Sequence, residues 1–198
     1  MLLVTDVDGP LGNCEKIARK LGLGKIYEEC KNNLAKLEVE IKHLDRDLNE
    51  IAYNLVNGFE INAGVVDTLE NLKERGYKNC ACTDNPIFGN KFLRDLFKEK
   101  FCRDGECVLD EIYATSSIDT ENKRIARLPG GKIEYVKNKF EDEKGILVVD
   151  DRNDMEVAKY VKEHYPKVKV VKVGENCKEL EKFSDYSFKS FYEILKIA

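Results

Sequence analysis

The chain opens with residues 2–9, Leu-Leu-Val-Thr-Asp-Val-Asp-Gly, in which an apolar run ends in two carboxylates. A short, continuous apolar run that stops at a Gly-Pro pair is typical of a buried strand followed by a turn. A second run, residues 146–149, Ile-Leu-Val-Val, ends at Asp150 in the same way. Strands that are buried on both faces occur in parallel sheets covered by helices. The two runs therefore predict an α/β fold.

Between these runs the hydrophobic period switches repeatedly between that of a strand and that of a helix. We expect helices over residues 63–75, 91–101, 130–140 and 153–164, and further strands over residues 78–82, 111–115 and 168–173. Residues 116–129 are expected to form a hairpin that turns at residues 120–122, and residues 184–198 a short extended piece and a closing helix. This alternation predicts a doubly wound parallel sheet with helices on both faces.

Residues 13–59 interrupt this alternation with a helical pattern. A first helix is expected near residues 14–21, and apolar residues then recur at alternating spacings of 3 and 4. They are Tyr27, Cys30, Leu34, Leu37, Ile41, Leu44, Leu48, Ile51 and Leu55. Such a heptad seam predicts one long helix with an apolar face. Asp47 and Glu50 have the spacing of a capping box, so a break before Asp47 is the alternative.

The seam must be buried against the first helix, against its own second half, or against a second subunit. The first helix is too short to cover it, because a helix rises only about 1.5 Å per residue. We therefore expect a homodimer that forms through this helix. The pattern divides the chain into a core of residues 1–12 and 60–198 and a helical insert of residues 13–59.

Composition excludes several classes of protein. The 198 residues include 42% hydrophobic and 35% charged residues, with a net charge of -4, which suits one soluble domain with an insert. The sequence has no basic stripe of the kind that would predict nucleic-acid binding. No apolar run approaches the ~20 residues that a membrane-spanning helix needs. The segment after Met1 lacks the pattern of a signal peptide, so we expect a cytoplasmic protein. Seven cysteines, an odd number without zinc spacing, predict free thiols in a reducing compartment.

Polar side chains suited to phosphate chemistry follow three of the expected strands. They are Asp6 and Asp8 after the first, Thr83, Asp84 and Asn85 after the second, and Asp150, Asp151 and Asp154 after the fourth. Ligands of open α/β sheets bind beyond the carboxyl ends of the strands. Carboxylates gathered there repel one another unless a cation lies between them, and Mg²⁺ is the usual divalent partner of phosphates. The sequence therefore predicts a magnesium-dependent phosphate site.

The order of these motifs resembles the haloacid dehalogenase (HAD) superfamily. The matching features are Asp6-x-Asp8-Gly9 after a strand, Thr83 at the end of the second strand, a later lysine, and Asp150-x3-Asp154 after an apolar strand. The late hairpin followed by Lys132 is most similar to phosphoserine phosphatase-like members. Pro10 stands where many members have Thr. The resemblance implies a Rossmann-like core and identifies the insert as a cap domain.

The resemblance also implies roles for individual residues. Asp6 would be the nucleophile that forms an aspartyl-phosphate, and Asp8 would be the general acid and base. Phosphate would contact Thr83, Asp84, Asn85 and Lys132, and Mg²⁺ would bind Asp6, Asp8, Asp150 and Asp154, with Asp151 as a further candidate. Lys132 fits best because it begins a helix, although Lys123, Lys137 and Lys139 lie nearby.

These features predict magnesium-dependent hydrolysis of a small phosphorylated metabolite, a phosphomonoester, without identifying it. A phosphotransferase or mutase would use the same residues. A scaffold that self-associates through the heptad helix would need none of them. A receiver-type signalling domain also uses acidic residues, Thr and Lys, but its phosphorylated Asp follows the third strand, and the expected strand at residues 111–115 ends in no Asp.

Overall fold

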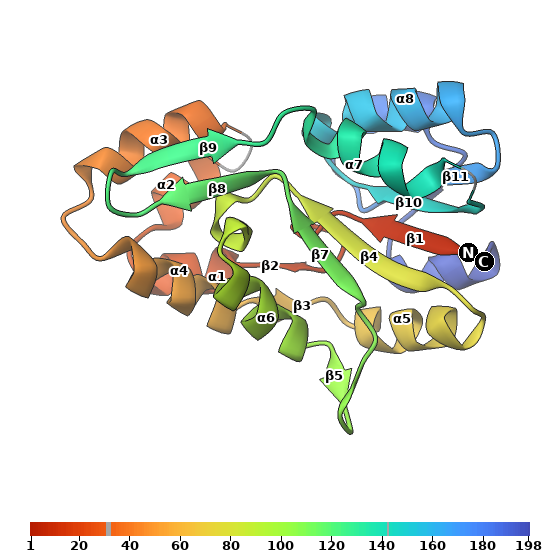
Figure 1. Cartoon of the computed structure of the whole chain (residues 1–198), viewed down its shortest axis with the longest axis horizontal. Helices are drawn as coiled ribbons and strands as arrows, with labels where there is room; N and C mark the ends of the chain where they lie inside the picture. The colour runs from red at the N-terminus through yellow and green to blue at the C-terminus, as the bar shows by residue number, and fades with distance from the viewer. Residues whose placement is uncertain (31–32, 142) are drawn as a thin grey trace.

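The computed structural model describes residues 1–30, 33–141 and 143–198. Its centre is a six-stranded sheet in the order β12-β11-β10-β1-β4-β7, and every pair of neighbours is parallel (Figure 1). The strands are β1 (Leu2–Thr5), β4 (Lys78–Thr83), β7 (Glu111–Ala114), β10 (Gly145–Val149), β11 (Val168–Val173) and β12 (Tyr186–Phe188). β1 therefore lies between β10 and β4, so that the three motif-bearing strands are neighbours. The predicted doubly wound α/β fold is confirmed.

Both faces of the sheet are buried because successive side chains of a strand point to opposite faces. Leu3 belongs to one core cluster, whereas Leu2 and Val4 belong to another. Figure 1 shows which helices cover each face: α5 (Val65–Glu74) and α6 (Lys91–Glu99) cover one, and α7 (Gly131–Phe140) and α8 (Met155–His164) cover the other. β1 and β10 are continuous apolar runs because both of their faces are buried.

The insert consists of separate helices, so the expectation of one long heptad helix is wrong. The helices are α1 (Glu15–Lys20), α2 (Gly24–Cys30), α3 (Leu34–His43) and α4 (Leu48–Asn57). Asn33 caps α3 by accepting the N–H of Lys36, and Asp47 caps α4 by accepting the N–H of Asn49. These carboxylate and amide oxygens satisfy N–H groups that a helix start leaves unpaired. The break before Asp47 is therefore present, and residues 31–32 of the expected helix lie outside the described ranges.

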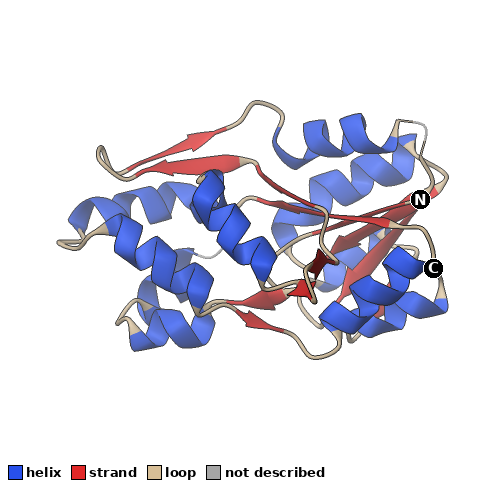
Figure 2. Ribbon diagram, turned by 60° about the horizontal axis from the view of Figure 1, so that its bottom comes forward, coloured by secondary structure: helices blue, strands red, loops and turns tan. Residues whose placement is uncertain are grey.

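The seam residues face the inside of the insert, where they line a cavity together with the carboxyl edge of the sheet. The expected homodimer through this seam is not tested by the structure of one chain and stays a prediction. Figure 2 shows the insert helices gathered at the end of the molecule away from both termini. The insert begins at β2 (Gly12–Asn13) and ends at β3 (Glu60–Ile61), and these two short strands pair with each other in antiparallel fashion.

The expected hairpin is present and lies against the insert. It consists of β8 (Ser116–Asp119) and β9 (Arg124–Arg127). Its Ile125 N–H donates to the Glu38 carboxylate over 3.0 Å. The Lys123 ammonium donates to the carbonyl of Leu44 over 2.5 Å. The hairpin therefore extends from the core onto α3, and both parts of the chain line the cavity.

The remaining elements are short. The 3₁₀ helices are η1 (Pro86–Gly89), η2 (Arg152–Asp154), η3 (Lys178–Phe183) and η4 (Phe191–Lys196), the last in place of the expected closing α-helix. The hairpin of β5 (Cys102–Arg103) and β6 (Glu106–Cys107) is joined by a disulfide between its two cysteines. The expectation of free thiols is wrong for this pair, because the hairpin register places the two residues opposite each other. No helix in the described ranges is long and apolar enough to cross a membrane.

A stability test follows from the aromatic cluster that joins the insert to the core. The ring of Phe97 lies 4.8 Å from Phe59 and from Phe88, and 5.2 Å from Phe101. Because Phe97 is fully buried, Phe97→Ala should lower the free energy of unfolding by about 3–5 kcal/mol in a denaturant titration. Phe92→Ala, on the same helix but 63% exposed, should change it by less than about 0.5 kcal/mol. Equal effects would contradict the packing described.

Candidate functional site

Three buried carboxylates meet at the carboxyl edge of the sheet. Asp6 directly follows β1, and Asp150 directly follows β10, with which β1 pairs in parallel. Asp154 ends η2, and its Oδ2 accepts the N–H of Asp150 over 3.2 Å. One oxygen from each of the three carboxylates lies within 4.8 Å of the others. The parallel register thus brings together residues that are nearly 150 positions apart.

Lys132 balances part of this negative charge. Its Nζ lies 2.7 Å from Asp6 Oδ2, 2.7 Å from Asp154 Oδ1 and 3.7 Å from Asp84 Oδ2. The side chain is only 9% exposed. It projects from the first turn of α7, which Gly130 starts with a left-handed backbone conformation at φ 78°. The structure therefore places Lys132, the lysine that the sequence favoured, in contact with Asp6, the expected nucleophile.

The other candidate lysines bind elsewhere. Lys139 Nζ lies 2.7 Å from a Glu111 oxygen, and Lys137 Nζ lies 3.8 Å from a Glu134 oxygen. Lys123 donates to a backbone carbonyl of the insert. Each of these contacts directs the ammonium away from the carboxylate cluster. Of these four lysines, the one that the sequence favoured, Lys132, is the one that contacts the carboxylate cluster.

The carboxylates and the ammonium change each other's proton affinity. Burial raises the pKa of Asp6 well above its usual value; Lys132 opposes this shift, and the charges of Asp154 and Asp150 add to it. Burial would lower the pKa of Lys132, but the charges of Asp154, Asp6 and Asp84 outweigh burial and hold that pKa well above its usual value. One ammonium thus faces several carboxylates. This excess of oxygen ligands and negative charge fits a hard divalent cation such as Mg²⁺.

Gly9 allows the loop after β1 to pass close to Asp150. Its φ is 98°, and a Cβ at this position would lie 2.0 Å from Asp150 Oδ2. The Asn62 side chain holds the loop by donating to the carbonyl of Gly9 over 2.7 Å. This position therefore favours glycine for two reasons: the backbone has a positive φ, and a side chain here would collide with Asp150.

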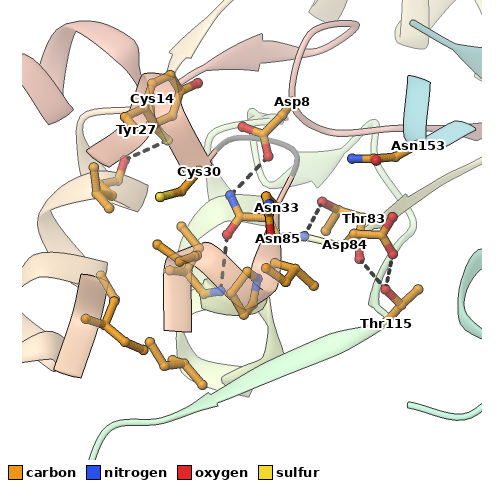
Figure 3. A pocket seen from close by; sticks show the side chains of 18 of the residues that line it. Asp8, Cys14, Tyr27, Cys30, Asn33, Thr83, Asp84, Asn85, Thr115 and Asn153 are labelled. Carbon is orange, nitrogen blue, oxygen red and sulfur yellow. Dashed lines mark hydrogen bonds between the residues drawn. The ribbon is translucent and has the colours of Figure 1, made fainter. Parts of the chain in front are cut away.

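Asp8 is oriented by the end of the next strand. Asn85 Nδ2 donates to Asp8 Oδ2 over 3.0 Å, and Asn85 Oδ1 accepts the N–H of Ile87 at the start of η1 (Figure 3). Thr83 Oγ1 accepts the N–H of Asn85 over 3.0 Å. Asn85 is thus fixed at both ends of its side chain. Because it bonds Asp8, it links the ends of β1 and β4.

Asp84 is held by two hydroxyl groups that the sequence analysis did not single out. The Thr115 hydroxyl donates to the Asp84 carboxylate, and the Ser116 hydroxyl donates to the Asp84 carbonyl over 2.5 Å. Thr115 directly follows β7, the neighbour of β4, and Ser116 begins β8. Their position at the end of a third strand is the signal by which the sequence could have identified them. That signal is weak, because hydroxyl residues are common at strand ends.

Asp8 and Asp151 lie outside the cluster of three carboxylates found in the described ranges. Asp151 Oδ1 accepts the N–H of Asn153 over 2.8 Å and so caps η2. The two histidines of the chain are not among the residues that line the site. His43 ends α3, and His164 ends α8, where its Nδ1 lies 2.9 Å from the carbonyl of Tyr160.

A cavity of about 720 Å³ opens from these groups into the insert. Its core side includes Asp6, Asp8, Thr83, Asp84, Asn85 and Lys132. Its insert side includes all nine seam residues, Tyr27, Cys30, Leu34, Leu37, Ile41, Leu44, Leu48, Ile51 and Leu55. Figure 3 shows Tyr27, Cys14 and Cys30 on the insert side and Thr83, Asp84 and Asn85 on the core side. The pattern that predicted a helix interface therefore forms the wall of the site.

Comparisons with known proteins identify the fold. No protein-family profile matches the chain, and no curated protein matches it by sequence. A phosphoserine phosphatase in apo form is 19% identical with a TM-score of 0.71, covering 98% of this chain and 97% of that one. A phospho-aspartyl intermediate analogue of phosphoserine phosphatase is 17% identical with a TM-score of 0.71, covering 99% and 97%. The chain thus has the fold of these phosphatases, in line with the predicted resemblance.

A third solved structure with this fold bears the family description. A HAD family hydrolase from Salmonella enterica serovar Typhi is 12% identical with a TM-score of 0.69. The similarity covers 98% of this chain and 70% of that one. The fold class is therefore that of the HAD hydrolases, and it includes the insert as well as the core.

The charge balance of the site can be tested through stability. Lys132→Met leaves buried carboxylates without their ammonium, and such a loss typically costs roughly 3–5 kcal/mol. We expect the free energy of unfolding, measured by denaturant titration in EDTA, to fall by about this amount. Lys137→Met, one turn and a half further along the same helix, removes an exposed pair and should cost about 1 kcal/mol or less. Similar losses in the two variants would show that Lys132 does not balance the cluster.

Proposed function

We propose that the protein is a magnesium-dependent phosphatase that hydrolyses a phosphomonoester through an aspartyl-phosphate on Asp6. The observation that carries the proposal is the contact of Lys132 Nζ with both Asp6 and Asp154, at 2.7 Å each, at the carboxyl edge of a HAD-type sheet. The arrangement supplies a nucleophile, a cation for the phosphoryl group and oxygen ligands for a metal. Solved phosphoserine phosphatases with the same fold support the reaction type.

In the first step an oxygen of Asp6 attacks phosphorus, a P–O bond to Asp6 forms, and the bond to the alcohol breaks. Asp8 gives its proton to the departing alcohol oxygen. In the second step Asp8 takes a proton from a water molecule, whose oxygen attacks phosphorus and frees Asp6 and inorganic phosphate. Asn85 keeps the Asp8 carboxylate at the cavity for both steps through its 3.0 Å hydrogen bond.

The phosphoryl group would bind between the ends of β1 and β4. Lys132 supplies positive charge, and the Thr83 hydroxyl and the backbone after β4 supply hydrogen bonds. The Asp84 carboxylate would repel phosphate, and it lies 3.7 Å from Lys132 Nζ. We therefore assign Asp84 to positioning the ammonium, with Thr115 and Ser116 holding it in place.

Three carboxylates, Asp6, Asp150 and Asp154, are the metal ligands that the geometry favours, with the backbone carbonyl of Asp8 as a further ligand that the family resemblance implies. Asp151, which caps η2, remains a further candidate. When bound, magnesium supplies positive charge that stabilises the phosphoryl group during transfer. We further propose that residues 13–59, with the β8–β9 hairpin, form a cap that limits the access of water to the site.

The nucleophile is tested with Asp6→Asn. The amide cannot form the phosphoryl ester, so turnover of p-nitrophenyl phosphate with magnesium should fall by roughly 10⁴-fold or more. The wild type should lose its activity in EDTA and regain it when magnesium is added. Asp95→Asn, an exposed carboxylate on α6, is the matched control and should retain full activity. Turnover that persists in Asp6→Asn would exclude the proposed intermediate.

The proposed role of Asp8 as general acid and general base is tested with Asp8→Asn. Because the amide cannot exchange a proton in either step, kcat should fall by about 10²–10⁴-fold. With p-nitrophenyl phosphate, whose leaving group needs little protonation, the second step should slow more than the first. Rapid-quench measurements should therefore find more phosphorylated enzyme in the steady state than in the wild type. An unchanged kcat would remove Asp8 from the mechanism.

A further inference from the structure

The cavity is larger than a phosphate group needs. Its volume of about 720 Å³ lies in the range of cavities that hold ligands the size of a drug molecule. In the proposed reaction the phosphoryl group occupies the end near Asp6 and Lys132. The remaining space, beneath the insert, must then receive the alcohol part of the substrate. The chemistry of that wall therefore indicates the class of substrate.

The wall is apolar along the two longest helices of the insert. α3 contributes Leu34, Leu37 and Ile41, and α4 contributes Leu48, Ile51 and Leu55. Within the described ranges, residues 13–59 contribute no charged side chain to the lining. Asn33 and Tyr27 are the polar side chains that the described part of the insert adds, apart from two cysteine thiols.

The insert has many charged residues, but their ion pairs lie on its outer surface. Lys36 Nζ lies 2.5 Å from Glu29, and Lys42 Nζ lies 2.9 Å from Glu38. In each pair both side chains are at least 29% exposed. The apolar lining therefore reflects the side that each helix turns inward, and not a shortage of charged residues in this part of the sequence.

A charged alcohol part would bind this wall poorly. The ammonium and carboxylate of a phosphorylated amino acid would lose their hydration against the insert and find no charged partner on its described residues, which is costly. The charged side chains of the lining, which include Arg127, Arg152 and Glu156, come from the hairpin and the core. An alkyl or aromatic group would instead leave water for an apolar surface, which is favourable in proportion to the area buried. The same wall thus disfavours one substrate class and favours another.

We infer, on the basis of the proposed phosphatase activity, that the substrate is a phosphomonoester of an alcohol with an extended apolar group, which the insert buries. The phosphate and its ester oxygen lie at the Asp6 end, where Asp8 can protonate the leaving oxygen. The apolar group extends along α3 and α4. Specificity then comes from the length and shape of the apolar group, and charged groups on it reduce the rate.

The experiment measures kcat/KM for a series of n-alkyl phosphates from ethyl to decyl, each below its micelle concentration, with O-phosphoserine as the charged comparison. Each buried methylene should raise kcat/KM about fourfold until the cavity is filled. O-phosphoserine should be slower than propyl phosphate, its nearest uncharged counterpart. A series without slope, or a preference for O-phosphoserine, would overturn the substrate inference and leave the phosphatase proposal intact. Absence of turnover for every ester, p-nitrophenyl phosphate included, would overturn both.

Two variants on α3 connect the effect to the wall. Leu37 lines the cavity and is partly buried, so Leu37→Gln should reduce the decyl phosphate rate at least tenfold and should reduce the ethyl phosphate rate by much less. Val39→Gln, at a position 52% exposed on the same helix, should leave the whole series unchanged. Calorimetric binding of decyl phosphonate and methyl phosphonate to the wild-type protein provides a second readout without turnover. Equal affinity for the two phosphonates would contradict an apolar binding wall.

Discussion

The ammonium of Lys132, held between the carboxylates of Asp6 and Asp154, is the contact on which the site depends. Buried carboxylates this close together repel strongly, and a cation among them is required for them to remain ionised. The fold provides for this contact in three ways. The strand order places the ends of β1 and β10 side by side, Gly9 lets the first loop approach Asp150, and the start of α7 delivers the lysine. Each of these features serves a site that no single segment of the chain contains.

The core and the insert contribute different chemistry to one cavity. The carboxyl edge of the sheet presents carboxylates, hydroxyls and an ammonium, whereas α3 and α4 present aliphatic side chains. Among the described residues, the charged side chains of the lining thus all come from outside residues 13–59. The scaffold alternative required the heptad face to be available to a partner, and the inward orientation of that face removes its main support.

The sequence predicted the parts of the fold that depend on local patterns. Apolar runs identified β1 and β10, and the residues that end them, Asp6 and Asp150, were placed correctly because parallel strands end at one edge. The prediction of one long helix was wrong. Apolar residues at alternating spacings of 3 and 4 are found both in one long helix and in several short helices that each turn one face inward, so the spacing does not distinguish the two. Asn33 and Asp47 carried the opposing signal, because each caps a new helix.

Features that depend on contacts between distant segments could not be read from the sequence. The helix start favoured Lys132 in the sequence, but the pairing of its neighbour Lys139 with Glu111 needed the fold. The bonds from Thr115 and Ser116 to Asp84 join residues about 31 positions apart, and hydroxyl residues give no distinctive pattern. The disulfide needed the register of a hairpin that composition does not reveal.

The pairing of β2 with β3 has a consequence for how such a protein diversifies. The insert leaves the core at Gly12–Asn13 and returns at Glu60–Ile61, on two strands that lie next to each other. A change in the segment between these two paired strands leaves the strand order of the sheet and the carboxylate cluster unaltered. Evolution can therefore lengthen, shorten or replace the segment between these strands as a module, changing one wall of the cavity while the residues at the sheet edge stay the same.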